Sequence, residues 1–499
     1  MSELRRILIA SFDAVPEATG ASARLTELVR GLTPVFDVDA LTPKGDGHSH
    51  IERYYGARLM RVPMLRRELP SRALTFERAM RRQLESNEYE LVHVTDPFGG
   101  YPARQRRGVS SHRIVYDAHG LPSLWIRLAR PELLGELRFL TRLRRLERHC
   151  LLSADLVIAS SEAFRGHLQL LGVPAERVRI VPPPIDLSLF REAPPPSEGP
   201  FRLTHVGGGA PWEGTEVLLD ALRVLLDQGV PARLCLAGQR DDAARRFLRQ
   251  ALAARRLTDA VELPGPLPHD QIPDLLERTH VCLAPLAAPP LVGPIGEGSM
   301  KVAEYLAAGR PIVAADTALH RELVGSSGAA GFFRAGDSLD LAQRLAALWK
   351  DERRRADMGD RARERARLAF DAALSRRALL RAYYELLDPS IVVNASAYAA
   401  ERNRGGSDTA TQAATVTASA EPVTNPAMSD PTAPASHVET RGGPLPTPTS
   451  PAPITHAKPP PPTADLTPPR GLADSTHGAP PPDEVDWFSD HLPDGSKEP

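Results

Sequence analysis

The chain has 499 residues, which is long enough for two or three domains. Its 61 lysines and arginines nearly balance its 62 aspartates and glutamates, so the charge argues against a nucleic-acid-binding protein. Its three cysteines are scattered and lack metal-ligand spacing, so we predict no disulfide framework, no metal site and a reducing, cytoplasmic setting.

The first half of the chain alternates short apolar runs with amphipathic stretches. Strands are predicted over residues 7–10, 35–41, 58–62, 91–94, 113–116, 155–161 and 178–181. Helices are predicted between several of them, at residues 24–32, 73–86 and 129–152. Such βα alternation is typical of a parallel sheet with helices on its faces.

Polar residues follow three of these strands, at the edge where parallel sheets bind ligands. The loop over residues 11–23 contains Gly20 and leads into a helix that begins with Arg24. His93 lies in the 91–94 strand, and His119 follows the 113–116 strand and precedes Gly120. We take these residues as candidates for ligand contact; the alternatives are a turn glycine and structural histidines. Neither half carries a GxGxxG pattern, so a nicotinamide-dependent dehydrogenase is not expected.

The helical stretch 129–152 is dense in arginine, with Arg138, Arg142, Arg144, Arg145 and Arg148 between leucines. A basic amphipathic face suits an anionic membrane surface, so we expect peripheral contact with the inner membrane surface; the alternative is a solvated helix face. No run of about 18 apolar residues occurs, so no membrane-spanning helix is predicted.

A second alternation follows an extended, proline-rich linker at residues 182–186. Strands are predicted over residues 201–206, 232–238, 261–264, 281–285 and 311–315, and a last long helical region over residues 339–387. Two such units predict an α/β chain of two Rossmann-like, doubly wound domains, residues 1–190 and 191–387, facing a cleft. Residues 388–499 are rich in Pro, Thr and Ala and poor in large apolar residues, so we predict a disordered tail.

The stretch 293–316 is the strongest candidate site. A glycine-rich loop with Gly296, Gly298 and Ser299 opens a predicted helix over residues 301–308. A loop leading into a helix N-terminus is a ready anion site. Lys301 and Glu304 share one helix face at i, i+3, which places an ammonium for phosphate beside a carboxylate for sugar hydroxyls. The alternative is an ordinary solvated Lys–Glu pair.

These residues resemble glycosyltransferase family 4, the retaining enzymes of GT-B fold, over most of residues 5–387. Features in the family's order are Gly20 after the first strand, His119-Gly120, residues 154–161, Gly172-Val-Pro, Val206-Gly207, Leu236-Ala-Gly238, residues 304–313 and Gly336-Asp337. The resemblance implies the GT-B fold, in which the last helix crosses back to the first domain.

The family's pattern also implies roles for single residues. Glu304 would hold the ribose hydroxyls of a nucleotide, because a carboxylate accepts two hydroxyl hydrogen bonds. A second glutamate is usual eight positions earlier, where this chain has Gly296 with Glu297 next to it. Either Glu297 serves near the donor sugar, or the chain follows the Lys-x-x-Glu-Tyr pattern through Lys301. Amides around Gly296 and Gly298 would face the diphosphate.

One departure concerns the family's Gly-Arg-x-x-x-x-Lys-Gly pattern after the first strand of the second domain. The two cation positions are Gly208 and Glu213 here, next to the donor-side Gly207. Charge on the leaving diphosphate must still be stabilised, so we hypothesise that Lys301 is the principal cation.

The resemblance therefore implies retaining transfer of a hexose from a nucleotide-diphosphate sugar to a glycan, lipid-linked or small-molecule acceptor bound by residues 1–190. His119 would contact the donor sugar or the departing oxygen, and Gly20, Arg24 and His93 would lie on the acceptor side. No cofactor or metal ion is expected. The alternatives are a catalytically degenerate nucleotide-sugar-binding or scaffold protein and a GT-B nucleotide-sugar epimerase.

Overall fold

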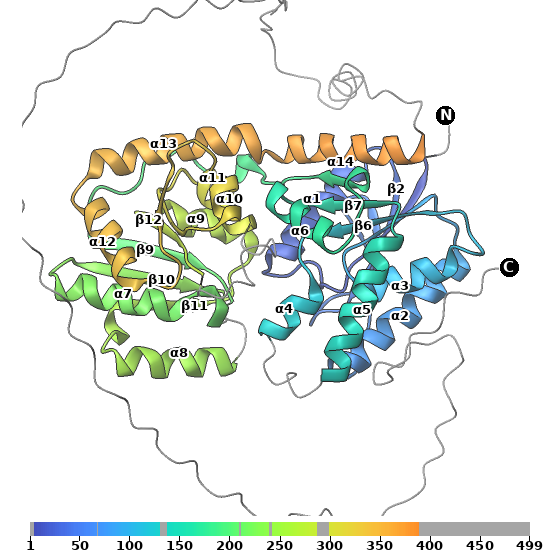
Figure 1. Ribbon diagram of the computed structural model, residues 1–499, viewed down its shortest axis with the longest axis horizontal. Coiled ribbons are helices and arrows are strands. Elements are labelled where there is room, and N and C mark those ends of the chain that lie inside the picture. Colours follow the sequence, from blue (N-terminus) through green and yellow to red (C-terminus); the bar gives the residue numbers. More distant parts are fainter. Residues whose placement is uncertain are drawn as a thin grey trace, which may run out of the picture. The chain divides into compact units, whose positions relative to one another are not determined.

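The computed structural model describes residues 4–66, 68–129, 137–208, 211–238, 242–286 and 299–388. Within these ranges two separate sheets are formed, each flanked by helices (Figure 1). They confirm the predicted class of two parallel-sheet α/β domains. The predicted tail beyond Asp388 lies outside the described residues. The domain boundaries and the cleft stay predictions.

The first sheet has eight strands in the order β3-β4-β2-β1-β5-β6-β7-β8. They are β1 (Arg6–Ala10), β2 (Asp37–Pro43), β3 (Ile51–Tyr54), β4 (Ala57–Val62), β5 (Leu91–Val94), β6 (Arg113–Ala118), β7 (Leu156–Ala159) and β8 (Val178–Ile180). Every pair is parallel except β3 with β4. The central strand β1 pairs Ile7 with Val38 on one side and with Leu91 on the other.

The antiparallel strand β3 was not predicted. It forms a hairpin with β4 through Tyr55 and Gly56, which have φ angles of 47° and 90°. Its first residue, Ile51, is 64% exposed, so β3 carries almost no burial pattern that a sequence could reveal.

The helices of the first half are α1 (Gly20–Leu32), α2 (Leu69–Ser86), α3 (Pro97–Arg106), α4 (Pro122–Ala129), α5 (Leu137–Ser153) and α6 (Glu162–Leu170). Helix α1 begins four residues earlier than predicted, because the Thr19 hydroxyl accepts a hydrogen bond from Ser22 N at 3.0 Å and caps the helix there. Gly20 is therefore the first residue of α1 and does not lie in the loop.

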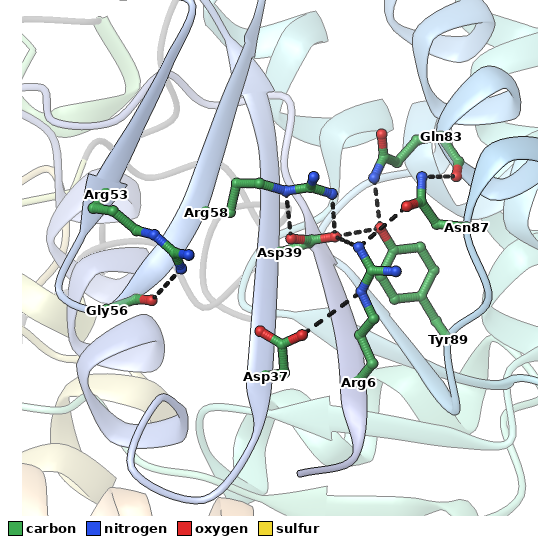
Figure 2. A network of polar contacts seen from close by, with 9 residues as sticks. All are labelled: Arg6, Asp37, Asp39, Arg53, Gly56, Arg58, Gln83, Asn87 and Tyr89. Carbon is green, nitrogen blue, oxygen red and sulfur yellow. Dashed lines mark hydrogen bonds and ion pairs between the residues drawn. The ribbon is translucent and has the colours of Figure 1, made fainter. Parts of the chain in front are cut away.

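The amino ends of the strands in this sheet are held by a polar network around Asp39 (Figure 2). Arg58 binds Asp39 through two hydrogen bonds of 2.8 and 2.7 Å, and Arg6 and the Tyr89 hydroxyl bind it at 2.8 and 2.6 Å. The network ties β1, β2 and β4 to the end of α2 at the edge opposite to the carboxyl ends of the strands. The network therefore stabilises the sheet, and it lies away from the edge where parallel sheets bind ligands.

The second sheet has six parallel strands in the order β11-β10-β9-β12-β13-β14. They are β9 (Phe201–Val206), β10 (Ala232–Ala237), β11 (Val261–Gly265), β12 (Val281–Ala284), β13 (Ile312–Ala315) and β14 (Ala330–Phe333). The edge strand β14 was not predicted. The strand order reverses between β9 and β12, which is where doubly wound sheets bind ligands at their carboxyl ends.

The helices of the second half are α7 (Thr215–Asp227), α8 (Asp242–Ala254), α9 (Ile272–Glu277), α10 (Ser299–Ala307), α11 (Ala318–Val324), α12 (Ser338–Trp349), α13 (Glu352–Ala369) and α14 (Ala372–Leu387). The long helical region predicted over residues 339–387 is divided into three helices. The divisions fall at Asp351 and Asp371, whose carboxylates cap α13 and α14 through Arg354 N and Ala373 N.

Helix α14 packs against elements of the first sheet. Its Tyr383 ring lies 5.9 Å from the Phe36 ring, and the Tyr383 hydroxyl lies 2.6 Å from Nδ1 of His93 in β5. Just before α14, the linker residue Ile185 exchanges two backbone hydrogen bonds of 2.8 and 2.9 Å with Phe370 and Ala372. The linker and the start of α14 are thus fixed together.

Candidate functional site

Glycines end three neighbouring strands of the second sheet and bring their backbones close together. Gly207 N donates to Ala237 O at 2.8 Å, and Gly238 N donates to Gly265 O at 2.7 Å. Gly238 has a φ of +115°, and a Cβ atom there would lie only 2.5 Å from Gly207 O. A side chain therefore has no room at Gly207 or Gly238, whereas a Cβ atom on Gly265 would meet nothing within 4 Å.

Glu213, which stands where the family's pattern has a cation, forms an ion pair with Lys301. Lys301 Nζ lies 2.9 Å from Glu213 Oε1, with side-chain exposures of 16% and 5%. The pair joins the turn just before α7 to the first turn of α10. A Cβ atom on Gly207 would lie 2.5 Å from the same Oε1, and one on Gly208 would lie 3.6 Å from Oε2. The glutamate is thus buried against the predicted donor-side glycines and paired with the predicted cation.

His205, in β9, approaches the same point and was not predicted. Its side chain is buried, and Nδ1 lies 3.0 Å from the carbonyl oxygen of Leu283. Burial, helped by the Lys301 charge, lowers the pKa of His205 to about 4, so the ring is neutral at pH 7. Because a carbonyl only accepts, Nδ1 carries the proton and Nε2 is an acceptor. No residue pattern distinguishes such a histidine from an ordinary strand residue.

Glu304 lies one turn further along α10, as predicted, and its residue is 5% exposed. Burial raises the pKa of its carboxyl to about 8, against the opposing effect of Lys301. Glu304 Oε1 lies 3.4 Å from Nδ1 of His269, whose pKa burial lowers. Next to it, the hydroxyl of buried Tyr305 accepts a hydrogen bond of 2.8 Å from Val206 N. This bond ties α10 to the carboxyl end of β9.

The remaining donor-side predictions fall on or beside residues without described positions. Ser299 is the first residue of α10. Gly296, Glu297 and Gly298 lie outside the described residues, so their roles stay predictions.

In the first sheet, the candidates Arg24 and His93 belong to a buried polar chain. Arg24 forms two hydrogen bonds of 3.0 Å to Asp117, and His93 Nε2 lies 3.6 Å from the same carboxylate. Although burial opposes ionisation, the Arg24 guanidinium and His93 hold the pKa of Asp117 below its usual value. His93 in turn contacts Tyr383 of α14. Arg24 and His93 are thus both buried and share Asp117 as a partner inside the fold.

His119 follows this chain at the carboxyl end of β6. Burial lowers the pKa of its ring, so His119 is neutral at pH 7. Its Nδ1 is buried and has no hydrogen-bond partner in the part of the chain that the structure describes. An orphaned ring nitrogen at a sheet's ligand-binding edge is a group for a ligand to satisfy.

The starts of helices α1 and α10 also meet. A Cβ atom on Gly20 would lie 3.5 Å from Cβ of Met300, an ordinary contact distance. The first residue of α1, expected on the acceptor side, is thus next to the helix that carries Lys301 and Glu304.

The residues that the structure describes contain no group of three or more His, Cys, Asp or Glu side chains that could hold a metal ion. None of their helices combines the length and the apolar character needed to cross a membrane.

Two family models match the chain in succession: Glycosyltransferase Family 4 over residues 18–189 and Glycosyl transferases group 1 over residues 200–351. A relative in Escherichia coli strain K12, WcaL, is named as a colanic acid biosynthesis glycosyltransferase. It is 28% identical over 232 residues, which are 45% of this chain and 55% of WcaL. The chain thus spans about half the length of this relative.

Solved structures show the same fold. Sucrose-phosphate synthase from Thermosynechococcus elongatus aligns with a TM-score of 0.66 at 21% identity, over 77% of this chain and 100% of that one. HepE of Anabaena, solved in complex with UDP-glucose, aligns with a TM-score of 0.61 at 19% identity, over 76% of this chain and 99% of that one. At such identities the likeness concerns the fold alone.

Proposed function

The chain belongs to the family 4 glycosyltransferases of GT-B type, and on that premise we propose that it transfers a hexose from a nucleotide-diphosphate sugar with retention of anomeric configuration. Support comes from the matching family models and from a named glycosyltransferase relative. The acceptor is a glycan, a lipid-linked sugar or a small molecule. UDP is the first donor nucleotide to test, because the similar HepE was solved with UDP-glucose.

One observation carries the proposal: the buried carboxyl of Glu304 stands on α10 beside the point where the strand order of the second sheet reverses. In the proposed complex Glu304 binds the ribose hydroxyls. A carboxyl that is neutral at pH 7 can accept one hydroxyl hydrogen bond and donate another. The Tyr305 bond to Val206 fixes the direction from which the carboxyl approaches.

The chemistry then needs a group for the negative charge that develops on the departing diphosphate. The Lys301 ammonium, in the first turn of α10, pairs with Glu213, whose carboxylate is packed against Gly207, and in the proposed complex the charge lies beside this pair. In the first domain, the neutral ring of His119 offers its orphaned Nδ1 to the donor sugar or the departing oxygen. The buried Arg24–Asp117 pair holds the strand end that carries His119.

For the acceptor, we propose the carboxyl edge of the first sheet, near Gly20. The neighbouring helix α5 exposes Arg144, Arg145 and Arg148. These side chains support peripheral contact with an anionic membrane, as a lipid-linked acceptor would require.

The proposal is tested by incubating the full chain with UDP-, GDP- and ADP-hexoses. Thermal stabilisation identifies the bound nucleotide, and proton NMR of the sugar released without acceptor identifies its first anomer. An α-linked donor is expected to release the α anomer first. Release of the β anomer first would contradict retention. A chain that shows no thermal stabilisation and no sugar release with any of these donors would contradict the proposal as a whole.

A second function, nucleotide-sugar binding without turnover, is favoured by one observation. Gly208 and Glu213 stand at the two cation positions, and the nearby cation Lys301 is paired with Glu213. Tight, stoichiometric donor binding without hydrolysis or transfer across a range of acceptors would support this second function over catalysis.

A further inference from the structure

We propose that Glu213 is a positioning residue, which holds the Lys301 ammonium at the end of β9 where the donor's diphosphate binds. The inference rests on the proposed function and deepens it. Glu213 departs from the family's pattern, and in this role it contributes to donor binding. Glu213 itself does not contact the reacting atoms.

Glu213 and Lys301 form a buried ion pair. Glu213 is 5% exposed, and its Oε1 lies 2.9 Å from Lys301 Nζ. A buried carboxylate without a cation is strongly unfavourable, so the pair is held together by the cost of separating it. A lysine side chain is a flexible four-carbon stem, so its ammonium group is held in one position only when it has a partner. Glu213 supplies that partner.

The position of the Glu213 carboxylate requires a glycine at position 207. A Cβ atom on Gly207 would lie 2.5 Å from Glu213 Oε1 and would also collide with His205 Nε2. The absence of a side chain at Gly207 therefore lets Glu213, and with it Lys301, reach the strand end.

The ring of His205 indicates a place for a ligand beside this pair. His205 is 1% exposed, and its Nε2 has no hydrogen-bond partner among the described residues. That nitrogen and Glu213 Oε1 both approach Gly207. A buried acceptor without a donor is costly unless a hydroxyl or a water fills the place. The point that Lys301 faces is therefore built to receive a polar group from outside the chain.

If Glu213 acts through position, geometry matters more than charge. Glu213→Gln loses the ion pair but keeps an oxygen at the same place, which still accepts a hydrogen bond from the Lys301 ammonium. It also removes the negative charge that repels the diphosphate. Glu213→Asp keeps the charge but withdraws the carboxylate by one carbon, so Lys301 is drawn away. A merely repelling role predicts tighter binding for Glu213→Gln and no change for Glu213→Asp, so the Asp variant separates the two roles.

The test is calorimetric titration of the full chain with UDP and with inorganic pyrophosphate. We expect Glu213→Gln to bind UDP within about threefold of the wild type or more tightly, and Glu213→Asp to bind about tenfold more weakly, as for one lost charge-assisted hydrogen bond. The donor KM should follow the same order, whereas the acceptor KM should not. Wild-type affinity in Glu213→Asp would overturn the proposal.

A charge exchange gives an independent measurement. Lys301→Glu should abolish UDP binding, and Glu213→Lys combined with Lys301→Glu should restore part of it by placing the cation on the other side of the same pair. No recovery in the correctly folded double variant would overturn the proposal. Arg223→Ala, which removes an exposed pair with Asp227 on α7, is the matched control and should leave UDP affinity unchanged.

These results separate the inference from the proposed function. A wild-type chain that binds no nucleoside diphosphate and no nucleotide-sugar overturns both. Wild-type binding that Lys301→Ala weakens but Glu213→Asp does not overturns only the positioning role.

Discussion

Glu304 Oε1 lies 3.4 Å from Nδ1 of His269, and both side chains are neutral at pH 7. The contact joins α10 to the turn that precedes α9. Burial is the cause on both sides, because it disfavours the charged form of a carboxyl and of an imidazole alike. The proposed ribose-binding group is therefore a protonated acid before the nucleotide arrives.

This state predicts a stability that falls as the pH rises. The folded pKa of about 8 is above the ordinary value of 4.5, so the contribution of Glu304 is complete below pH 4.5 and is lost as the pH rises through 8. The loss is about 1.4 kcal/mol per pH unit in that window. Glu304→Gln should remove this dependence. Urea unfolding at several pH values checks it; parallel curves for the two proteins would contradict it.

The glycine edge of the second sheet predicts a steep cost for one methyl group. Gly238→Ala places Cβ 2.5 Å from Gly207 O at a φ of +115°, and should lower the free energy of unfolding by about 1–3 kcal/mol from backbone strain, before the clash is counted. Gly166→Ala in α6, where a Cβ meets nothing within 4 Å, is the control. It should raise stability by about 0.5–1 kcal/mol. Equal effects of the two substitutions would argue against the close backbone packing.

A carboxylate of the second half caps a helix of the first. Glu322 in α11 accepts hydrogen bonds of 2.5 and 2.7 Å from Glu162 N and Ala163 N, the first two amides of α6. Glu322→Ala should speed amide exchange at both residues about fivefold, as for one lost cap of about 1 kcal/mol. Ser161→Ala, which removes the bond to Phe164 N, should instead act mainly on Phe164. Unchanged exchange in Glu322→Ala would show that the contact is not made in solution.

His119 predicts a separation of binding from turnover. If its Nδ1 meets the donor sugar or the departing oxygen, His119→Ala should lower kcat about a hundredfold and leave UDP affinity within a few-fold. In the wild-type chain the ring is neutral, because burial lowers its pKa. The wild-type kcat should therefore not fall between pH 7 and 8 through titration of His119. A kcat of wild-type size in His119→Ala would exclude the role.

Much of the architecture followed from local patterns. Buried strands such as β7 and β12 are continuous apolar runs, and the aspartates that cap α13 and α14 were present in the printed sequence. The edge strands β3 and β14 were not predicted. Their apolar residues, such as the exposed Ile51 and the half-buried Phe332, do not form a clear alternation of buried and exposed positions. Helix α1 was placed late because a Thr19 cap before glycine and two alanines does not stand out from a loop.

The site divides in the same way. Glu304 and Lys301 were found from their spacing on one helix, a local relation. Their partners were not: Glu213 lies 88 residues from Lys301, and His269 lies 35 residues from Glu304. Which carboxylate meets which cation depends on how β9 and α10 pack, and a spacing rule contains no such information. The sequence thus revealed Glu213 only as an anomaly, and the fold reveals its partner.

The central claim is that the Glu304 carboxyl binds the ribose of a nucleotide-sugar. Its most direct test is calorimetric titration of wild-type chain and Glu304→Ala with the UDP-sugar that the wild type binds. We predict binding at least about tenfold weaker in Glu304→Ala, since two hydroxyl hydrogen bonds are lost, with the folded state intact by thermal melting. Equal affinity of the two proteins would contradict the claim.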